Sequence, residues 1–177
     1  MSRPSRIARE DLPTKGSALT FHTADLSDGF PDKTRVPEPL FTNYGGRVRL
    51  SGPVATVRVR DDNVLVREAL ETVPEGTVVV VDGGGSKRCA LVGGNLAKTA
   101  AERGLGGIVV NGCVRDAHEL AALDLGVLAL ATHPKKSAKN GTGERDVPVL
   151  LGGVEIAPGE YLYADADGLL VSPERLL

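Results

Sequence analysis

A short glycine-rich run in the sequence could bind an anion. The run is Val92-Gly93-Gly94-Asn95-Leu96, and it comes directly before a segment with helical periodicity. Backbone N–H groups at the start of a helix have no acceptor within the helix, and the helix dipole favours a negative charge there. A carboxylate or a phosphate would therefore suit this position. The alternative is a tight loop in which Asn95 caps the helix and no ligand binds.

A second group of polar residues follows further along the chain, in Arg115-Asp116-Ala117-His118-Glu119. Asp116 and Glu119 are three residues apart at an expected helix start, so their side chains should share one face, with Cβ atoms about 5–6 Å apart. Two carboxylates at that spacing can hold a hard divalent cation, directly or through water. Arg115 could bind a substrate carboxylate through two parallel hydrogen bonds. The alternative is a capping box, in which the two acids serve only the helix start.

Other polar and sulfur-containing residues give weaker signals. The loop Asp82-Gly83-Gly84-Gly85-Ser86 follows the most apolar segment, where ligand loops are common, but a wide turn explains it as well. His118 is expected to be solvated, and Cys89 and Cys113 are expected to be buried or loop residues, because no CxxC pair accompanies them. The segment Asp165-Ala166-Asp167-Gly168 lacks the further ligands of an EF-hand loop and predicts an ordinary turn.

Composition excludes several classes of protein. The chain has 177 residues, of which 41% are hydrophobic and 25% charged, and these values are typical of a globular domain. Its net charge is −2 and aromatic residues make up 3%, which argues against a dedicated nucleic-acid binder. There is no apolar run long enough to cross a membrane and no apolar core of a secretion signal near the N-terminus. We therefore expect a cytoplasmic protein with no direct nucleic-acid contact and no membrane partner.

The nucleotide-binding fingerprints G-x-G-x-x-G and G-x-x-x-x-G-K-[ST] do not occur in the chain. Their absence counts against an NAD enzyme, a typical Rossmann methyltransferase and a P-loop nucleotidase.

Hydrophobic periodicity predicts an α/β fold. Strands of a central sheet are expected over 53–60, 77–81, 107–110 and 127–131. Helices are expected over 23–29, with Thr23 as its N-cap, and over 63–71, 95–103 and 116–124. The alternation of strands and helices indicates parallel strands with right-handed crossovers. Short segments at 149–151, 154–156, 160–163 and 169–171 predict a β-meander or small barrel. Residues 1–19 are predicted to be a flexible tail and residues 20–177 a single domain.

In their order and spacing, these motifs resemble the class II aldolase/RraA-like family, named partly for a regulator of ribonuclease E activity. The matching segments extend over roughly residues 20–175 and are Thr23–Asp28, Val80–Gly85, Gly93–Leu96, Val110–Asp116, Val147–Val149, Gly152–Val154, Pro158–Glu160 and Ala164–Gly168. Members with lyase activity share a pattern of Gly, twenty residues, Arg-Asp, two residues and an acid. That pattern is filled here by Gly94, Arg115, Asp116 and Glu119.

The resemblance implies a fold, an assembly and an activity. The fold would be a single α/β domain of the swivelling β/β/α type, with mixed parallel and antiparallel strands, assembled as a homotrimer. The activity would be that of a divalent-metal-dependent lyase, which cleaves 4-hydroxy-4-methyl-2-oxoglutarate to pyruvate and decarboxylates oxaloacetate, both through the pyruvate enolate. The alternative is a regulator that binds and inhibits an endonuclease of the ribonuclease E type. The intact pattern favours the enzyme.

The resemblance also implies roles for individual residues. The pyruvyl end of a small 2-oxo acid would be bound by Gly93, Gly94, Asn95 and Leu96, with Arg115 also contacting the substrate. Asp116 would be the ligand of a Mg²⁺ or Mn²⁺ cofactor, and Glu119 would assist catalysis by orienting a water molecule.

Overall fold

The computed structural model describes residues 20–177, so the tail expected over residues 1–19 lies outside the described residues. Its helices are α1 (Thr23–Gly29), α2 (Val64–Thr72), α3 (Gly94–Glu102) and α4 (Ala117–Ala121). Its strands are β1 (Thr42–Asn43), β2 (Leu50–Arg58), β3 (Val78–Asp82), β4 (Ala90–Val92), β5 (Gly107–Val114), β6 (Val127–Thr132), β7 (Glu144–Arg145), β8 (Val149–Leu151), β9 (Val154–Ile156), β10 (Tyr161–Asp165) and β11 (Gly168–Ser172).

The strands form one large mixed sheet and one small one. The large sheet has the order β1-β6-β5-β3-β2-β10-β11, with β4 added to β5 and β7 added to β2. Strands β2, β3, β5 and β6 are parallel, as expected from the alternation of strands and helices. Strands β1, β10 and β11 pair antiparallel with their neighbours, and β8 and β9 form a separate antiparallel hairpin.

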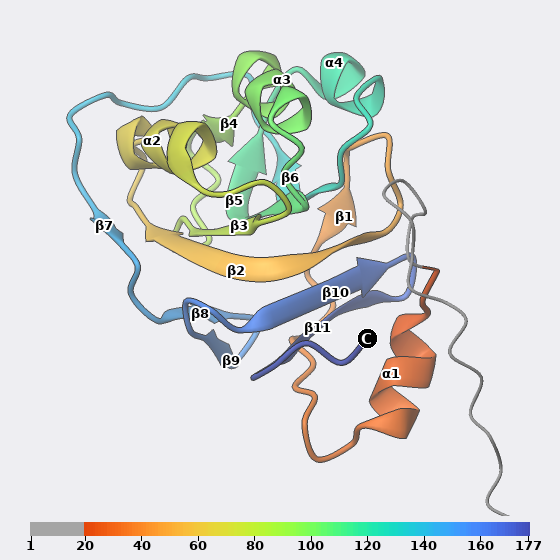
Figure 1. Cartoon of the computed structure of the whole chain (residues 1–177). Helices are drawn as coiled ribbons and strands as arrows, with labels where there is room; N and C mark the ends of the chain where they lie inside the picture. Colours follow the sequence, from red (N-terminus) through yellow and green to blue (C-terminus); the bar gives the residue numbers. More distant parts are fainter. Residues whose placement is uncertain (1–19) are drawn as a thin grey trace, which may run out of the picture.

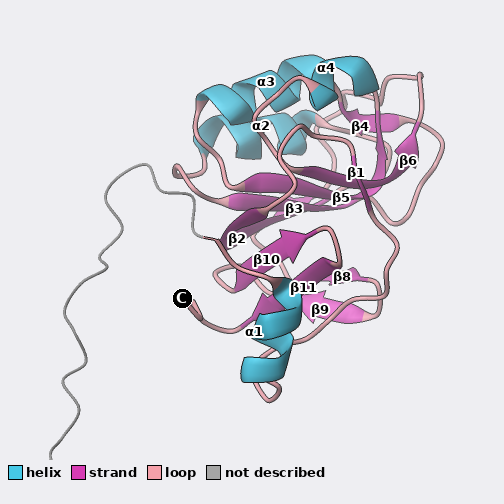
Figure 2. Ribbon diagram, turned by 90° about the vertical axis from the view of Figure 1, so that its right-hand side faces the viewer, coloured by secondary structure: helices cyan, strands magenta, loops and turns pink. Residues whose placement is uncertain are grey.

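The domain has four layers (Figures 1 and 2). Helices α2, α3 and α4 cover one face of the parallel strands, and the large sheet curls so that β10 and β11, with the β8–β9 hairpin, cover the other face. Helix α1 packs on the outer side of β10 and β11. Side chains of β3 show why the strand is apolar throughout. Val79 and Val81 pack into the cluster beneath the helices, while Val78 and Val80 pack into the cluster that includes Leu162 and Ile156. Because successive side chains of a strand point to opposite faces, a strand covered on both faces needs apolar residues at every position. The predicted mixed α/β domain is confirmed.

The C-terminal segments differ from the expected meander or barrel. They form two hairpins, and β10 joins the large sheet by pairing with β2, so that Leu162 lies opposite Gly52. Helix α4 ends at Ala121, earlier than predicted, because the carbonyl groups of Glu119 and Leu120 accept hydrogen bonds from Ala122 N and Leu123 N in a tighter turn.

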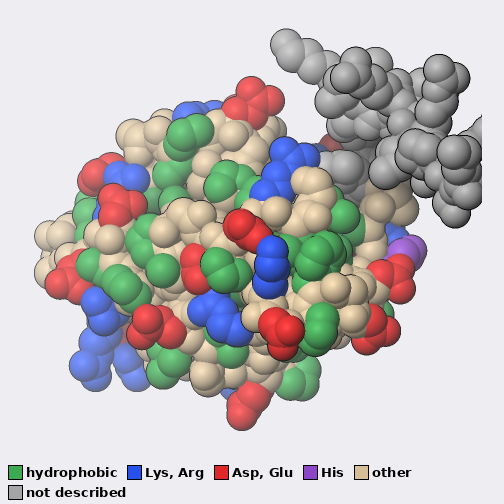
Figure 3. Space-filling model, turned by 60° about the horizontal axis from the view of Figure 1, so that its bottom comes forward, with side chains coloured by type: hydrophobic (Ala, Val, Ile, Leu, Met, Phe, Trp, Pro, Cys, Tyr) green, Lys and Arg blue, Asp and Glu red, His purple; other side chains and the backbone are tan. Residues whose placement is uncertain are grey.

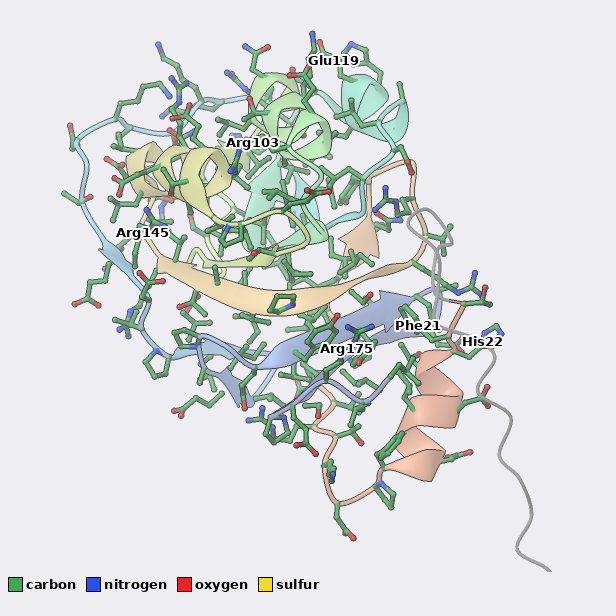
Figure 4. All side chains as sticks on the ribbon, in the orientation of Figure 1. Phe21, His22, Arg103, Glu119, Arg145 and Arg175 are labelled. Atoms are coloured by element: carbon green, nitrogen blue, oxygen red, sulfur yellow. The ribbon has the colours of Figure 1, made fainter. Side chains whose placement is uncertain are left out.

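Arg103 links helix α3 to helix α2 by hydrogen bonds. Arg103, just after α3, donates to the carbonyl oxygens of Leu70 (2.7 Å) and Val73 (2.8 Å), at the end of α2 (Figure 4). Carbonyl groups at the end of a helix have no N–H partner further along that helix. The guanidinium group supplies the missing hydrogen bonds and fixes α3 beside α2.

Thr23 is not the N-cap of α1, as the sequence had suggested, because His22 occupies that position. The backbone N–H and the hydroxyl of Thr23 instead each donate to the carboxylate of Asp165, at 2.7 Å. Burial raises the pKa of Asp165, but the hydrogen bonds from Thr23 and from Asp167 N outweigh it and hold the pKa below its usual 3.8. The predicted turn at Asp165–Gly168 is confirmed, and its first residue attaches α1 to the sheet.

Asp165→Asn should lower the free energy of unfolding by about 1 kcal/mol at neutral pH, because a charge-assisted acceptor is lost. The pKa of Asp165 is lowered in the folded state, so its contribution is present at pH values well above 3.8 and is lost as the pH falls through the lowered value. Denaturant unfolding of both proteins from about pH 6 to about pH 3 checks this. A stability difference that stays constant over that range would contradict the role of the ionised carboxylate.

The surface carries charges of both signs. On the face shown in Figure 3, acidic and basic side chains are interspersed. In the part of the chain that the structure describes, no helix is long and apolar enough to span a bilayer.

Candidate active site

The sheet brings the two polar motifs together. Strands β4 and β5 are parallel neighbours, with Val92 paired to Val114, so their carboxyl ends lie side by side. Arg115 N donates to Val92 O at 2.9 Å directly beyond this pair. The twenty residues between Gly94 and Arg115 are therefore helix α3, a turn and strand β5, which return the chain to its starting edge.

Asp116 does not cap its own helix. Its backbone is left-handed, with φ 59° and ψ 45°, and its side chain makes no capping hydrogen bond at the start of α4. Its Oδ2 atom instead accepts a hydrogen bond from Gly94 N, the first N–H of α3, at 2.9 Å. The capping-box interpretation of Asp116 is therefore wrong, since the left-handed turn directs the carboxylate to the neighbouring helix. Within the described residues, its Oδ1 atom has no hydrogen-bond partner.

The alternative in which Asn95 caps α3 is also wrong. Helix α3 starts one residue earlier, with Gly93 at the N-cap position and no side-chain cap. Asn63 precedes α2 without capping it. Val64 N is bonded to Asp62 Oδ1 at 3.0 Å, and the Asn63 amide donates to Leu91 O at 3.2 Å.

The close approach of neighbouring side chains explains why residues 93 and 94 are both glycine. A Cβ atom built on Gly93 would lie 2.8 Å from Asp116 Oδ2 and 3.3 Å from Arg115 Cγ. A Cβ atom built on Gly94 would overlap with Glu119 Oε2. Arg115, Asp116 and Glu119 therefore all lie against the start of α3, and Figure 4 shows Glu119 in the region of α3 and α4. The sequence motifs predicted these residues but not this reason for the glycines.

A cleft of about 80 Å³ opens at this junction. Its lining includes the predicted Gly93, Gly94, Asn95, Leu96, Arg115 and Asp116, and also Asn63, Arg67, Ala90, Lys136, Ser137 and Lys139. Glu119 is not among the lining residues and lies behind Gly94. The segment with Lys136 follows β6, the next parallel strand, and loops after parallel strands are frequent ligand sites. The position of this segment, directly after a predicted parallel strand, is the signal by which the sequence could have indicated Lys136.

A larger hollow of about 720 Å³ lies at the ends of β2 and β3 and includes Asp82, Gly83 and Gly84. The N–H groups of this glycine loop are already used. Gly84 N is bonded to Asp82 Oδ1, and Gly83 N and Gly85 N both donate to Asn111 O. The loop is therefore the wide turn that the sequence also allowed. Because the N–H groups of its glycines are already bonded, none of them is left to bind an anion.

The histidine and cysteine side chains match their expectations. The His118 side chain is 83% exposed, and its Nε2 atom lies 3.7 Å from Glu119 Oε1. Cys89 and Cys113 are free and buried, and burial raises the pKa of both thiols, which disfavours the nucleophilic thiolate.

The donor set decides which cation could bind. Among residues 20–177, no group of three or more His, Cys, Asp or Glu side chains could enclose a metal. Asp116 offers a free carboxylate oxygen beside the cleft, with Glu119 next to it across Gly94. Mg²⁺ is commonly held by one or two carboxylates, with water and substrate completing its coordination. The residues therefore fit Mg²⁺ or Mn²⁺ and do not fit a closed zinc site.

Comparisons with known proteins identify the family of this chain. The RraA-like (Aldolase/RraA) profile matches residues 23–171, and the chain belongs to this family. A protein of Burkholderia multivorans is 58% identical over 163 residues, which cover 89% of this chain and 99% of that protein. A protein of Alkalilimnicola ehrlichii is 56% identical over 159 residues, with coverages of 90% and 99%. Both are provisionally named 4-hydroxy-4-methyl-2-oxoglutarate aldolases.

Two solved structures have the same fold. The RNA-processing inhibitor RraA from Thermus thermophilis is 52% identical, with a TM-score of 0.86, over 90% of this chain and 96% of that one. A Geobacillus kaustophilus protein described as an S-adenosylmethionine:2-dimethylmenaquinone methyltransferase is 56% identical, with a TM-score of 0.87, over 88% and 97%. These neighbours confirm the RraA-like fold.

Proposed function

We propose that this protein is a divalent-metal-dependent lyase that cleaves 4-hydroxy-4-methyl-2-oxoglutarate to two pyruvates and decarboxylates oxaloacetate. The observation that carries the proposal is the placement of Arg115 and the free Asp116 oxygen against the start of α3, where an oxo-acid carboxylate would bind. The names of the two bacterial relatives support the same substrate.

The start of α3 would bind the pyruvyl end. In the described part of the chain, the N–H groups of Asn95 and Leu96 have no acceptor, and both residues line the cleft. A substrate carboxylate can accept these hydrogen bonds in the favourable field of the helix dipole. Among residues 20–177, the Arg115 side chain makes one long hydrogen bond, to Pro134 O at 3.4 Å, so its remaining N–H groups are available to the 2-oxo group.

Cleavage breaks the bond between C3 and C4. A base takes the proton of the 4-hydroxyl group, C4 becomes the carbonyl carbon of one pyruvate, and the bonding electrons leave as the enolate of the other, which is then protonated at C3. In oxaloacetate the same bond breaks with loss of CO₂. Arg115 places a fixed positive charge near the enolate oxygen, and Glu119 orients a water molecule for the proton transfer.

The metal would be held by Asp116, with Glu119 beside it. When bound, it supplies a Lewis acid that stabilises the negative charge of the enolate. A lysine Schiff base is not required. The test is pyruvate release from both substrates with Mg²⁺ or Mn²⁺ present, and no release from either would refute the enzyme.

Arg115→Lys should lose most of the turnover, by about a hundredfold, because lysine keeps the charge but not the planar fork of donors. Steady-state kinetics with oxaloacetate checks this, with Arg47→Lys as the matched control, because Arg47 is paired with Asp124 outside the cleft. Near-normal turnover of Arg115→Lys would show that only the charge at this position matters.

A regulatory role is the second candidate, because the Thermus neighbour is described as an inhibitor of RNA processing. We propose as the alternative that this chain binds an endonuclease of the ribonuclease E type. Co-purification with that enzyme tests it. The methyltransferase description of the other neighbour finds no support in this sequence, which lacks the glycine-rich nucleotide-binding fingerprint.

The proposal also includes a cytoplasmic homotrimer. Large apolar side chains remain exposed on the described chain and could be covered by packing between subunits: Val36, Leu40, Val48 and Leu150. Light scattering tests the assembly, and a monomer at micromolar concentration would contradict it.

A further inference from the structure

A buried carboxylate lies beneath the long connection between β6 and β7. Asp62 is 1% exposed, and it forms no ion pair with any residue that the structure describes. A carboxylate without a countercharge is costly to bury, unless hydrogen bonds replace the water that it loses. Asp62 is not among the residues that line the cleft, so contact with a ligand does not explain its burial.

Three backbone N–H groups surround this carboxylate. Val64 N, at the start of α2, donates to Asp62 Oδ1 at 3.0 Å. Asn140 N and Gly141 N both donate to Asp62 Oδ2, at 2.5 and 3.1 Å. Hydrogen bonds to a carboxylate are roughly twice as strong as those between neutral groups. The side chain therefore joins the start of α2 to a segment that begins 78 residues further along the chain.

The connection comprises residues 133–143 and contains no helix or strand. Figure 1 shows it running past the side of the helical layer where α2 lies. Its first half is held by hydrogen bonds between backbone groups, such as that from Ala138 N to Asp61 O at 2.8 Å. For residues 139–142, the described part of the chain offers the backbone no hydrogen-bond partner other than Asp62. The second half of the connection therefore depends on this one side chain.

The same connection forms one side of the cleft. Its cationic side chains Lys136 and Lys139 are among the lining residues, and Lys139 Nζ is bonded to Asn63 Oδ1, next to Asp62, at 3.0 Å. A lining segment that is fixed before a ligand arrives requires little ordering when the ligand binds. Release of the connection from Asp62 would add this cost to binding and leave the residues proposed for the chemistry in place.

We propose that Asp62 is a positioning residue, whose carboxylate fixes the connection 133–143 against the start of α2 and so keeps one side of the cleft in place. Asp62 touches neither substrate nor metal and acts through the backbone of Asn140 and Gly141. The effect on catalysis rests on the proposed function, whereas the effect on the connection does not.

Amide hydrogen exchange of the wild-type protein tests the positioning without any substitution. After correction for intrinsic rates, Asn140 N–H and Gly141 N–H should exchange at least about tenfold more slowly than Thr142 N–H, which has no acceptor in the described protein. Equal corrected rates for the three groups would overturn the proposal.

Asp62→Asn tests the consequence for the cleft. Asparagine has one acceptor oxygen in place of two, and its NH₂ group would face N–H donors. We expect the KM for oxaloacetate to rise about tenfold while kcat changes by less than about threefold, because binding is weakened and the chemistry is not. Trypsin should cut after Lys136 or Lys139 at least about tenfold faster, because cleavage follows the population in which the connection is released. Mass spectrometry of the fragments identifies the cut.

Asp165→Asn is the matched control. It also removes a carboxylate that accepts hydrogen bonds from a distant segment, but Asp165 attaches α1 to β10 and does not line the cleft. The KM and the cleavage after Lys136 and Lys139 should equal those of the wild type. Equal changes in Asp165→Asn and Asp62→Asn would reduce Asp62 to a general stabiliser of the fold and contradict the positioning role.

An unchanged KM or an unchanged cleavage rate in Asp62→Asn would also contradict it. If Asp62→Asn does not fold, the exchange rates of the wild type decide. If the wild type releases no pyruvate from either substrate, the proposed function is refuted, while the exchange and trypsin measurements still decide whether Asp62 fixes the connection.

Discussion

Asp116→Asn should lower turnover of 4-hydroxy-4-methyl-2-oxoglutarate at least a hundredfold, or by about 2.7 kcal/mol of transition-state stabilisation. The melting temperature of the metal-free protein should barely move. Asparagine retains an oxygen that can accept the 2.9 Å hydrogen bond from Gly94 N, so the contact with α3 survives. What is lost is the anionic oxygen that a hard cation prefers. Steady-state kinetics and thermal unfolding of the metal-free variant separate the two effects.

Asp124→Asn is the control for loss of a charge, because its side chain is 86% exposed and pairs with Arg47 away from the cleft. Its turnover should equal that of the wild type. If Asp116→Asn kept near-normal activity that EDTA still abolished, Asp116 would not be the metal ligand, and its bond to Gly94 would be its only role.

Gly93→Ala should also lower turnover by about a hundredfold, because displacements near 1 Å in a catalytic site have effects of that size. The new methyl group would meet Asp116 Oδ2 at 2.8 Å and Arg115 Cγ at 3.3 Å, so both side chains must shift. Backbone strain is not the cause, since φ of Gly93 is −124° and any residue can adopt it. Circular dichroism should show a folded protein.

Gly29→Ala provides the control, because a Cβ atom built there meets nothing within 4 Å. It lies in α1, where alanine should stabilise the fold by about 0.5–1 kcal/mol without changing turnover. If Gly93→Ala turned over substrate normally, the close packing at the start of α3 would not be needed for catalysis.

The sequence predicted the helices and strands that have a clear apolar pattern in their own residues. The β-branched valine run of β3 predicted a strand covered on both faces, and the periodicity of α2 and α3 marked their positions to within one residue or so. Strand β5 was expected to end at residue 110 but continues to Val114, since Asn111 and Gly112 interrupt the apolar run without interrupting the strand. Strand β4, hidden in a glycine-rich stretch, is defined by its pairing with β5.

The site was predictable only in part, because part of it is defined by contacts between distant segments. The two motifs indicated Gly93–Leu96 and Arg115–Glu119, but whether Asp116 capped its own helix depended on a left-handed backbone that local spacing does not reveal. Arg67, Lys136 and Ser137 come from a different helix and a distant loop, and they reach the cleft through hydrogen bonds between segments, such as Ala138 N to Asp61 O. Such contacts are tertiary and leave no periodic pattern in the sequence.

The most direct test is the stoichiometry and metal dependence of 4-hydroxy-4-methyl-2-oxoglutarate cleavage. Pyruvate is measured with lactate dehydrogenase, first with Mg²⁺ or Mn²⁺, then in excess EDTA, then after the metal is restored. A metal-dependent lyase releases two pyruvates for each substrate molecule consumed, stops in EDTA and recovers when the metal returns. Turnover that continues in EDTA, or no turnover of this substrate and of oxaloacetate under any condition, would contradict the function that we propose for Arg115 and Asp116.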